Sequence, residues 1–170
     1  MGEGHSLFNC NAISSNHWKY IVIHHSATNQ GSTSAFHRSH TMLGYGGVAY
    51  HFVVGNGQGM KDGEVESTFR WKNQTIGTHV SVKSWEYNIH GIGICLVGNF
   101  EKKKPTSKQR NSLIQLIVKL MKDHNISSDN IIFHNQVPFD ANPKKSQQTL
   151  CPGKHLSRKK ILEEINEKFN

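Results

Sequence analysis

The chain has 170 residues, of which 35% are hydrophobic, and its formal net charge is +8 with histidine counted as neutral. That length suits one domain with a real core, and no apolar run is long enough to span a membrane. Three cysteines are too few for a disulfide framework, so they leave the cellular compartment open. The composition indicates a globular protein with a basic surface and excludes a membrane-spanning one.

Much of the positive charge lies in three short runs, Lys102–Lys104, Lys144–Lys145 and Arg158–Lys160. Each run taken alone is most simply a solvated face. Taken together they favour a polyanionic partner, either nucleic acid or a bacterial wall with its carboxylates and phosphates. No glycine-flanked aromatic motif or zinc-finger spacing supports nucleic acid, so we expect the wall and no nucleic acid.

The first predicted element, after a polar leader (residues 1–17), is a strand over Tyr20–Ser26. Its first four residues are aromatic or β-branched, as in a buried strand, and the run then ends in His24 and His25. Burying an imidazole costs free energy unless its nitrogens find partners. For a lone histidine a backbone hydrogen bond is the simpler partner, and a metal ion is the alternative.

A turn at Asn29–Thr33 can cap a short helix that runs to about Met42. His37 and His40 lie three residues apart on one face of that helix and could bind a metal together. Because no third ligand lies nearby in the sequence, one packed and one exposed histidine is the preferred interpretation.

Two strands and a cleft wall are expected next. Val48–Val54 is predicted to be a central strand, and an Asn56-Gly57 turn leads to a short strand at about Glu64–Ser67 that pairs back. Arg70–Asn88 is irregular and rich in Trp, His and Tyr, a composition that often walls a binding cleft.

The clearest periodic patterns follow. Gly91–Val97 is apolar throughout, as in a strand buried on both faces, and its Cys95 is expected to behave as a small buried hydrophobe. A long helix begins at Thr106, where Gln109 completes a capping box, and ends near His124. Its apolar stripe consists of Leu113, Ile114, Ile117, Val118 and Met121.

A short apolar strand, Ile131–Phe133, delivers His134, and a polar loop then leads to Cys151. Together with the strand-end His24, these residues are suitable zinc ligands. Three protein ligands with an open fourth position are typical of a catalytic zinc rather than a structural one. The pattern therefore shifts the interpretation of His24 from a core histidine towards a metal ligand.

A last helix from Ser157 is predicted to bury Ile161, Leu162, Ile165 and Phe169. Strands and helices thus alternate along the chain. This order predicts a single α/β domain over residues 18–170, with a mixed central β-sheet and helices packed on its faces.

Several short segments occur in an order that resembles a known family. They are Ile23–Thr28, Tyr50–Phe52, Gly77–His79, Tyr87-Asn88 with Gly93–Gly98, and Phe133-His134 with Thr149–Gly153. Any one segment is weak, but the ordered set resembles the type 2 N-acetylmuramoyl-L-alanine amidases. These share a fold with phage lysozyme-type amidases and animal peptidoglycan recognition proteins. The resemblance covers roughly residues 18–165.

The resemblance implies one zinc ion per chain, bound by His24, His134 and Cys151. It also implies that Tyr50 and Thr149 serve catalysis, either by donating hydrogen bonds to a developing oxyanion or by orienting the attacking water.

Other positions receive less specific roles from the same resemblance. His25 falls where the family tolerates other residues, and a packing or supporting role is preferred. His40 matches a family histidine that is not a zinc ligand. Tyr45, Trp71 and His79 are candidates to line a sugar-peptide groove, with core packing as an equal alternative.

The implied activity is zinc-dependent hydrolysis of the amide between N-acetylmuramic acid and L-alanine in bacterial peptidoglycan. Two alternatives stay open: a non-catalytic peptidoglycan-binding module, against which Cys151 argues, and an amidase that acts on soluble, recycled muropeptides. A missing cysteine pair after the first strand and the long basic loop Asn135–Gln148 favour a bacterial or phage enzyme over an animal recognition protein.

The expected partner is peptidoglycan or its muropeptides, and the chain is expected to be a monomer. We expect a periplasmic or secreted location. No signal peptide is visible, so a cytoplasmic location stays open.

Overall fold

The computed structural model describes residues 18–139, 142–146 and 149–169, and the predicted leader (residues 1–17) lies outside them. A five-stranded sheet with strand order β3-β2-β4-β1-β5 forms the centre. Its strands are β1 (Tyr20–His25), β2 (Phe52–Val54), β3 (Val65–Ser67), β4 (Gly91–Leu96) and β5 (Ile131–Phe133). Neighbours pair in parallel except β2 and β3, which are antiparallel. The predicted mixed central sheet is therefore confirmed.

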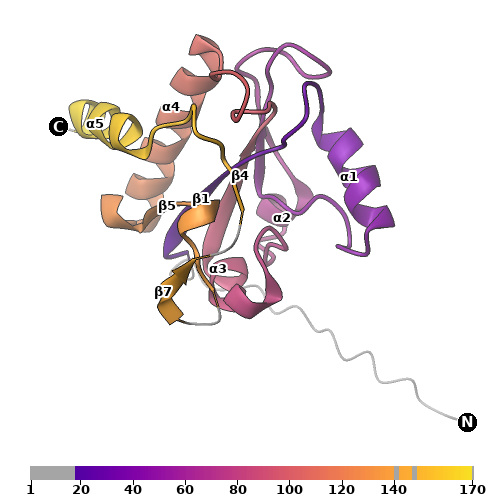
Figure 1. Cartoon of the computed structure of the whole chain (residues 1–170), viewed down its shortest axis with the longest axis horizontal. Helices are drawn as coiled ribbons and strands as arrows, with labels where there is room; N and C mark the ends of the chain where they lie inside the picture. The colour runs from indigo at the N-terminus through magenta and orange to yellow at the C-terminus, as the bar shows by residue number, and fades with distance from the viewer. Residues whose placement is uncertain (1–17, 140–141, 147–148, 170) are drawn as a thin grey trace, which may run out of the picture.

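One face of the sheet is covered by the two longest helices, α4 (Ser107–His124) and α5 (Arg158–Phe169), as Figure 1 shows. Successive side chains on a strand point to opposite faces. Ile21 and Ile23 of β1 therefore share this face, and both are fully buried in the main apolar cluster with the inner residues of the two helices. The hydrophobic core of the protein thus lies between the sheet and α4 and α5.

The opposite face carries the predicted metal ligand of β1. Val22 is buried here with Val80 and Val137, and the two-residue period places His24 on the same face. Helix α1 (Thr33–Met42) packs on this side through Phe36. The site therefore lies on the face away from the main core.

Helix α4 begins and ends where the sequence predicted. The Thr106 hydroxyl accepts a hydrogen bond from Gln109 N (3.0 Å), and the Gln109 side chain accepts one from Thr106 N (3.2 Å), which completes the capping box. Asn125 ends the helix in the left-handed region with φ of 53°. All residues of its predicted apolar stripe are buried except Val118, which is half-buried. No helix in the described part of the chain is long and apolar enough to cross a bilayer.

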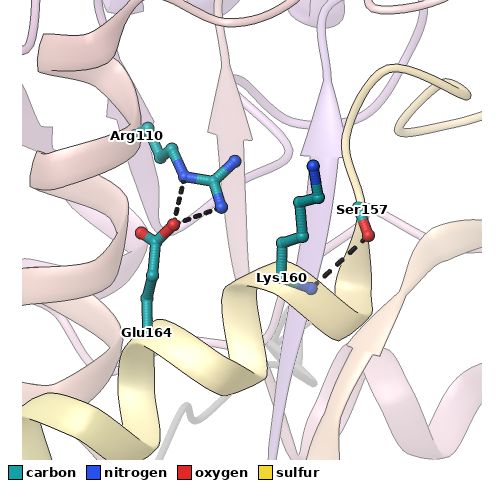
Figure 2. A network of polar contacts seen from close by, with 4 residues as sticks. All are labelled: Arg110, Ser157, Lys160 and Glu164. Atoms are coloured by element: carbon teal, nitrogen blue, oxygen red, sulfur yellow. Dashed lines mark hydrogen bonds and ion pairs between the residues drawn. The ribbon is translucent and has the colours of Figure 1, made fainter.

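Helix α5 docks on α4 through both apolar and charged contacts. Ile161 and Ile165 are fully buried against the core, whereas Leu162 is half-buried. The predicted burial of Phe169 concerns a side chain outside the described ones. Figure 2 shows the charged contact, in which Nε of Arg110 on α4 donates to Glu164 Oε1 on α5 (2.7 Å) and Nη2 donates to the same oxygen. At the start of α5, the Ser157 hydroxyl accepts a hydrogen bond from Lys160 N (3.4 Å) (Figure 2).

The central strand predicted over Val48–Val54 is shorter in the structure, because β2 begins only at Phe52. Side chains bind the preceding backbone in place of a neighbouring strand. His40 Nδ1 accepts from Ala49 N (3.0 Å), and Arg70 Nε donates to Val48 O (2.6 Å). Side chains therefore anchor Val48 and Ala49, and backbone pairing with β4 begins at His51, whose N donates to Gly93 O (2.8 Å).

Two stretches contain more regular structure than predicted. The irregular cleft wall holds the end of α2 (Phe69–Lys72), a 3₁₀ turn at Val82–Ser84 and α3 (Trp85–Ile89). Further 3₁₀ turns span Ser128–Asn130 and His134–Gln136. The polar loop after His134 contains a two-stranded antiparallel sheet, β6 (Pro138–Phe139) with β7 (Asn142–Ser146). Such short elements depend on contacts with the rest of the fold, which local periodicity does not record.

Candidate metal centre and groove

The three predicted metal ligands come together at the carboxyl edge of the parallel strands. His24 lies at the end of β1, and His134 follows the neighbouring strand β5 directly. Adjacent parallel strands end at the same edge, so these two side chains meet although 110 positions separate them. Cys151 is brought to them by two backbone contacts: Asn135 N donates to Cys151 O (2.9 Å), and His25 N donates to Cys151 Sγ (3.3 Å).

The distances within this group suit a tetrahedral zinc ion. His24 Nδ1 lies 3.1 Å from His134 Nδ1 and 3.7 Å from Cys151 Sγ, and all three donor atoms lie within 4.8 Å of one another. Zinc bonded to nitrogen at about 2.0–2.1 Å and to sulfur at about 2.3 Å separates its ligands by about 3.3 Å and 3.6 Å in a tetrahedron. The donor types and their spacing therefore fit. Residues 18–139, 142–146 and 149–169 contain no second cluster of this kind.

The charge states of the ligands follow from their surroundings. Burial lowers the pKa of His24 well below its usual value, and the neighbouring rings of His134 and His79 act in the same direction. Burial also raises the pKa of the Cys151 thiol to about 12, although the hydrogen bond from His25 N opposes this. The imidazole is thus neutral with a lone pair to donate. A cation in the site would displace the thiol proton and gain a thiolate ligand.

Tyr50 lies beside the metal ligands, with its ring centroid 5.1 Å from that of His24. Its phenol interacts with the thiol of Cys95 on β4. Burial, with a smaller contribution from that thiol, raises the pKa of Tyr50 well above its usual value. The phenol therefore keeps its proton and remains a hydrogen-bond donor next to the site.

Thr149 lies two residues before Cys151 and contacts its backbone. Its hydroxyl accepts a hydrogen bond from Cys151 N (3.2 Å). A hydroxyl that accepts in this way still has its own hydrogen to donate. Thr149 is thus a second donor held against a metal ligand.

A cavity of about 620 Å³ opens beside these residues. Its walls include His134 and Tyr50 together with the following residues: His40, Gly44, Tyr45, Ala49, Thr78, His79, Val80, Ser81, Val82, Trp85 and Asn88. Two of the three predicted groove residues, Tyr45 and His79, line it. Trp85 and Val82 are exposed at its rim, and the sequence singled out neither, because exposed aromatic and core aromatic residues look alike in a pattern.

Of the two roles left open for Trp71, groove lining and core packing, its contacts support core packing. Its ring packs on Phe52 at 4.7 Å and contacts Trp18 at 6.0 Å and His124 at 5.6 Å, in the main core cluster. It is not among the residues of the cavity. Trp71 takes the core-packing alternative because its short helix α2 faces the interior.

The remaining histidines lie where the simpler interpretations placed them. The ring of His25 points to the core side, where Nδ1 accepts from Phe100 N (3.1 Å). His37 is exposed and His40 is half-buried, and each accepts a backbone hydrogen bond from the loop after α1. His40 is also part of the cavity wall.

Arg70 is a site-building residue that the sequence did not reveal. Its guanidinium is buried and donates to four acceptors, which are Val48 O (2.6 Å), Ile76 O (2.6 Å), Tyr45 O (2.7 Å) and Thr78 Oγ1 (3.1 Å). Of these residues, Tyr45 and Thr78 line the cavity. A single arginine in an irregular stretch carries no pattern that distinguishes this role from an exposed charge.

The fold and this centre define a class: an open α/β sheet with a His-His-Cys cluster that could hold a metal ion, beside a groove at the carboxyl edge of its strands. The chain belongs to the N-acetylmuramoyl-L-alanine amidase family, because the family model of that description (Amidase_2) matches residues 14–154. The amidase and recognition-protein resemblance of the sequence is thereby confirmed.

Two solved structures share the fold. The N-acetylmuramoyl-L-alanine amidase LysC from Clostridium intestinale is 29% identical, with a TM-score of 0.72 over 90% of this chain and 89% of that one. Peptidoglycan recognition protein LE in complex with tracheal cytotoxin is 26% identical, with a TM-score of 0.61 over 89% of this chain and 80% of that one.

Sequence similarity also reaches animal proteins. Peptidoglycan-recognition protein LE of Drosophila melanogaster is 31% identical over 137 residues, which are 74% of this chain. The chain spans 36% of the length of that fly protein. Bacterial amidases and insect recognition proteins are therefore both relatives, and the preference for a bacterial or phage enzyme stays a prediction.

Proposed function

We propose that this protein is a zinc-dependent amidase that cleaves the bond between N-acetylmuramic acid and L-alanine in bacterial peptidoglycan. One observation carries the proposal. Cys151 completes a three-donor set with His24 and His134, and His134 also lines the neighbouring groove. A binding module needs the groove but has no use for three converging metal ligands beside it.

Zinc in this site would act as a Lewis acid that makes water a better nucleophile and polarises the amide carbonyl. The chain itself supplies two hydroxyl donors beside the ligands, Tyr50 and Thr149. Tyr50 keeps its proton at neutral pH and can donate to negative charge that develops on the carbonyl oxygen. Thr149 accepts from the backbone of Cys151 and so presents its hydrogen away from that bond, where it can orient water or substrate.

The surface outside the groove suits an anionic polymer. Lys102, Lys103 and Lys104 are all exposed, whereas the side chains of Lys144 and Lys145 lie outside the described ones. Exposed lysines attract the carboxylates and phosphates of a wall over about one Debye length, roughly 8 Å at physiological ionic strength. We therefore propose wall peptidoglycan as the substrate and a periplasmic or extracellular place of action.

A second candidate function is recognition of soluble muropeptides, with or without cleavage. It is favoured by the recognition-protein relatives, one of which has been solved in complex with tracheal cytotoxin, a monomeric diaminopimelic acid-type peptidoglycan. The cavity is large enough to hold a drug-sized fragment.

The test is to incubate the zinc-loaded protein with purified sacculi and, separately, with soluble muropeptides, and to identify the products by mass spectrometry. The proposal expects stem peptides with a free N-terminal L-alanine from sacculi. Cleavage of soluble muropeptides alone would support the second candidate in its catalytic form. Binding of either substrate without any product would exclude an amidase and support the second candidate in its non-catalytic form.

A further inference from the structure

A second buried histidine stands directly against the metal ligand of β1. His24 Nε2 lies 3.1 Å from His79 Nδ1, and the other nitrogen of His79, Nε2, lies 3.1 Å from Gly91 O. Both rings are buried. The three groups form a chain that runs from the backbone of β4 to the metal-facing ring.

The direction of both hydrogen bonds in this three-group series follows from the backbone oxygen at its end, Gly91 O. A carbonyl oxygen can only accept, so His79 Nε2 carries the hydrogen that points to Gly91 O. A neutral imidazole has one N–H, which leaves His79 Nδ1 as an acceptor. His24 Nε2 must then be the donor, and His24 Nδ1 holds the lone pair. That nitrogen is the one facing His134 Nδ1 and Cys151 Sγ.

The backbone leaves room for the ring of His79 only because two neighbours are glycines. A Cβ at Gly93 would stand 2.6 Å from His79 Cδ2, and one at Gly77 would stand 2.3 Å from the same atom. Real Cβ atoms essentially never approach so closely. Asn88 Oδ1 also accepts a hydrogen bond from His79 N (2.9 Å). Gly77, Gly93 and Asn88 therefore hold the ring of His79 in one place and one orientation.

We propose that His79 is a positioning residue that fixes Nδ1 as the metal-binding nitrogen of His24, with Gly91 O setting the direction of the hydrogen-bond chain. The proposal rests on the proposed function only in requiring that His24 binds zinc, and it does not require that the protein cleaves peptidoglycan. His79 therefore has a second role in addition to lining the groove, because its Nδ1 accepts the hydrogen bond of His24.

The motif Gly77-Thr78-His79 and the glycine at position 93 gain a physical explanation from this arrangement. A metal-bound imidazole usually donates its second N–H to a fixed acceptor, which orients the ring and raises its basicity. Here the acceptor is another imidazole rather than a carboxylate, so the site receives no additional negative charge from it.

A matched pair of variants separates the effect of the hydrogen-bond acceptor at position 79 from the effect of side-chain shape. His79→Asn can place its amide oxygen near the position of Nδ1, whereas His79→Leu has a similar volume and no acceptor. Both variants lose the bond to Gly91 O, so that loss cancels between them. Zinc affinity of each purified, folded chain is measured by competition with a chromophoric chelator.

The expected result is zinc affinity about 10- to 100-fold weaker in His79→Leu than in the wild type, with most of that loss recovered in His79→Asn. Equal affinity in wild type and His79→Leu would overturn the proposal. So would equal losses in both variants, because the lost affinity would then come from packing alone.

A measurement on the wild-type chain keeps the proposal testable if either variant fails to fold. Long-range ¹H–¹⁵N correlations of the imidazole rings report which nitrogen carries the hydrogen. The proposal expects the Nε2–H form of both His24 and His79 without metal, and zinc on His24 Nδ1 after loading. A hydrogen on His24 Nδ1 in the metal-free chain, or zinc on Nε2, would contradict it. Failure to cut sacculi would count only against the proposed function.

Discussion

The phenol of Tyr50 interacts with the thiol of Cys95, a residue of the central strand β4 that is completely buried. Burial raises the pKa of this thiol well above its usual value, so the sulfur keeps its hydrogen. The thiol donates to a backbone oxygen of its own strand, Leu96 O (3.8 Å). The pKa of the Tyr50 phenol is raised as well, so Tyr50 also keeps its hydrogen, beside the ring of His24.

Replacing Tyr50 by Phe tests this donor. The change removes one hydroxyl and almost no volume, so the fold and the zinc content should stay as in the wild type. Turnover on sacculi should fall by about two to three powers of ten if the hydroxyl stabilises charge only in the transition state, and substrate binding should hardly change. Tyr20→Phe, whose hydroxyl bonds the exposed Glu86 instead, is the control and should hydrolyse normally. A wild-type rate in Tyr50→Phe would remove Tyr50 from the mechanism.

Replacing Cys151 by Ser tests the third ligand. A neutral hydroxyl is a much poorer zinc ligand than a thiolate, so zinc affinity and activity should fall together. Cys95→Ala is the matched cysteine control: it should still bind one zinc per chain, because Cys95 is outside the ligand group. Metal analysis after dialysis, with activity measured on the same samples, gives the answer. Full zinc occupancy in Cys151→Ser would mean that the sulfur is not a ligand.

The main elements could be predicted because their patterns are local. The β-branched residues of β1 and the capping box of α4 at Thr106 and Gln109 each specify an element without help from the rest of the chain. The ligand histidines could be found because each ends an apolar strand. Cys151 lies in a polar loop and has no local signature, and it stands out only as a suitable third zinc ligand for two strand-end histidines.

The missed features depend on tertiary contacts. Groove lining and core packing were equal alternatives for Trp71, because an aromatic residue in a short helix does not show from the sequence alone which side it faces. Arg70 and Cys95 became visible only through their partners across the groove and the sheet. The pairing of His79 with His24 links residues 55 positions apart, and no spacing rule predicts it.

Replacing Arg70 by Met should loosen the groove and destabilise the fold. Three backbone carbonyls, at Val48, Ile76 and Tyr45, would lose their donor. Buried acceptors left unpaired cost about 1–3 kcal/mol each, and partial hydration of the loop reduces the sum, so we expect a loss of about 2–4 kcal/mol in the free energy of unfolding. Denaturant unfolding measures it, with the exposed Arg38→Met as control. Equal stability of the two variants would contradict the role assigned to Arg70.

The contact between α4 and α5 predicts a pH dependence of stability. The hydrogen bonds from Arg110 hold the pKa of Glu164 below its usual value. A carboxylate with a lowered pKa in the folded state stabilises the fold above its unfolded pKa of about 4.3, and this contribution is lost as the pH falls through the folded value.

Glu164→Gln should therefore lower the free energy of unfolding at neutral pH, by less than about 1 kcal/mol because the side chain is about a third exposed. The difference from the wild type should shrink as the pH falls below the unfolded pKa of about 4.3 and vanish once Glu164 is protonated in the folded state. The neighbouring Glu163→Gln, whose pairing with Lys159 is long (3.9 Å) and exposed, is the control and should change the free energy of unfolding at neutral pH very little. A Glu164→Gln effect that persists unchanged in acid would have to come from packing.

The central claim is that a single zinc ion held by His24, His134 and Cys151 makes this chain an amidase. The direct test is to strip the protein with a chelator, add zinc back in steps, and count the new N-terminal L-alanine groups released from sacculi at each step. The account predicts no release from the stripped protein and a rise that saturates at one zinc per chain. Release that is independent of zinc, or no release at full zinc occupancy, would contradict it.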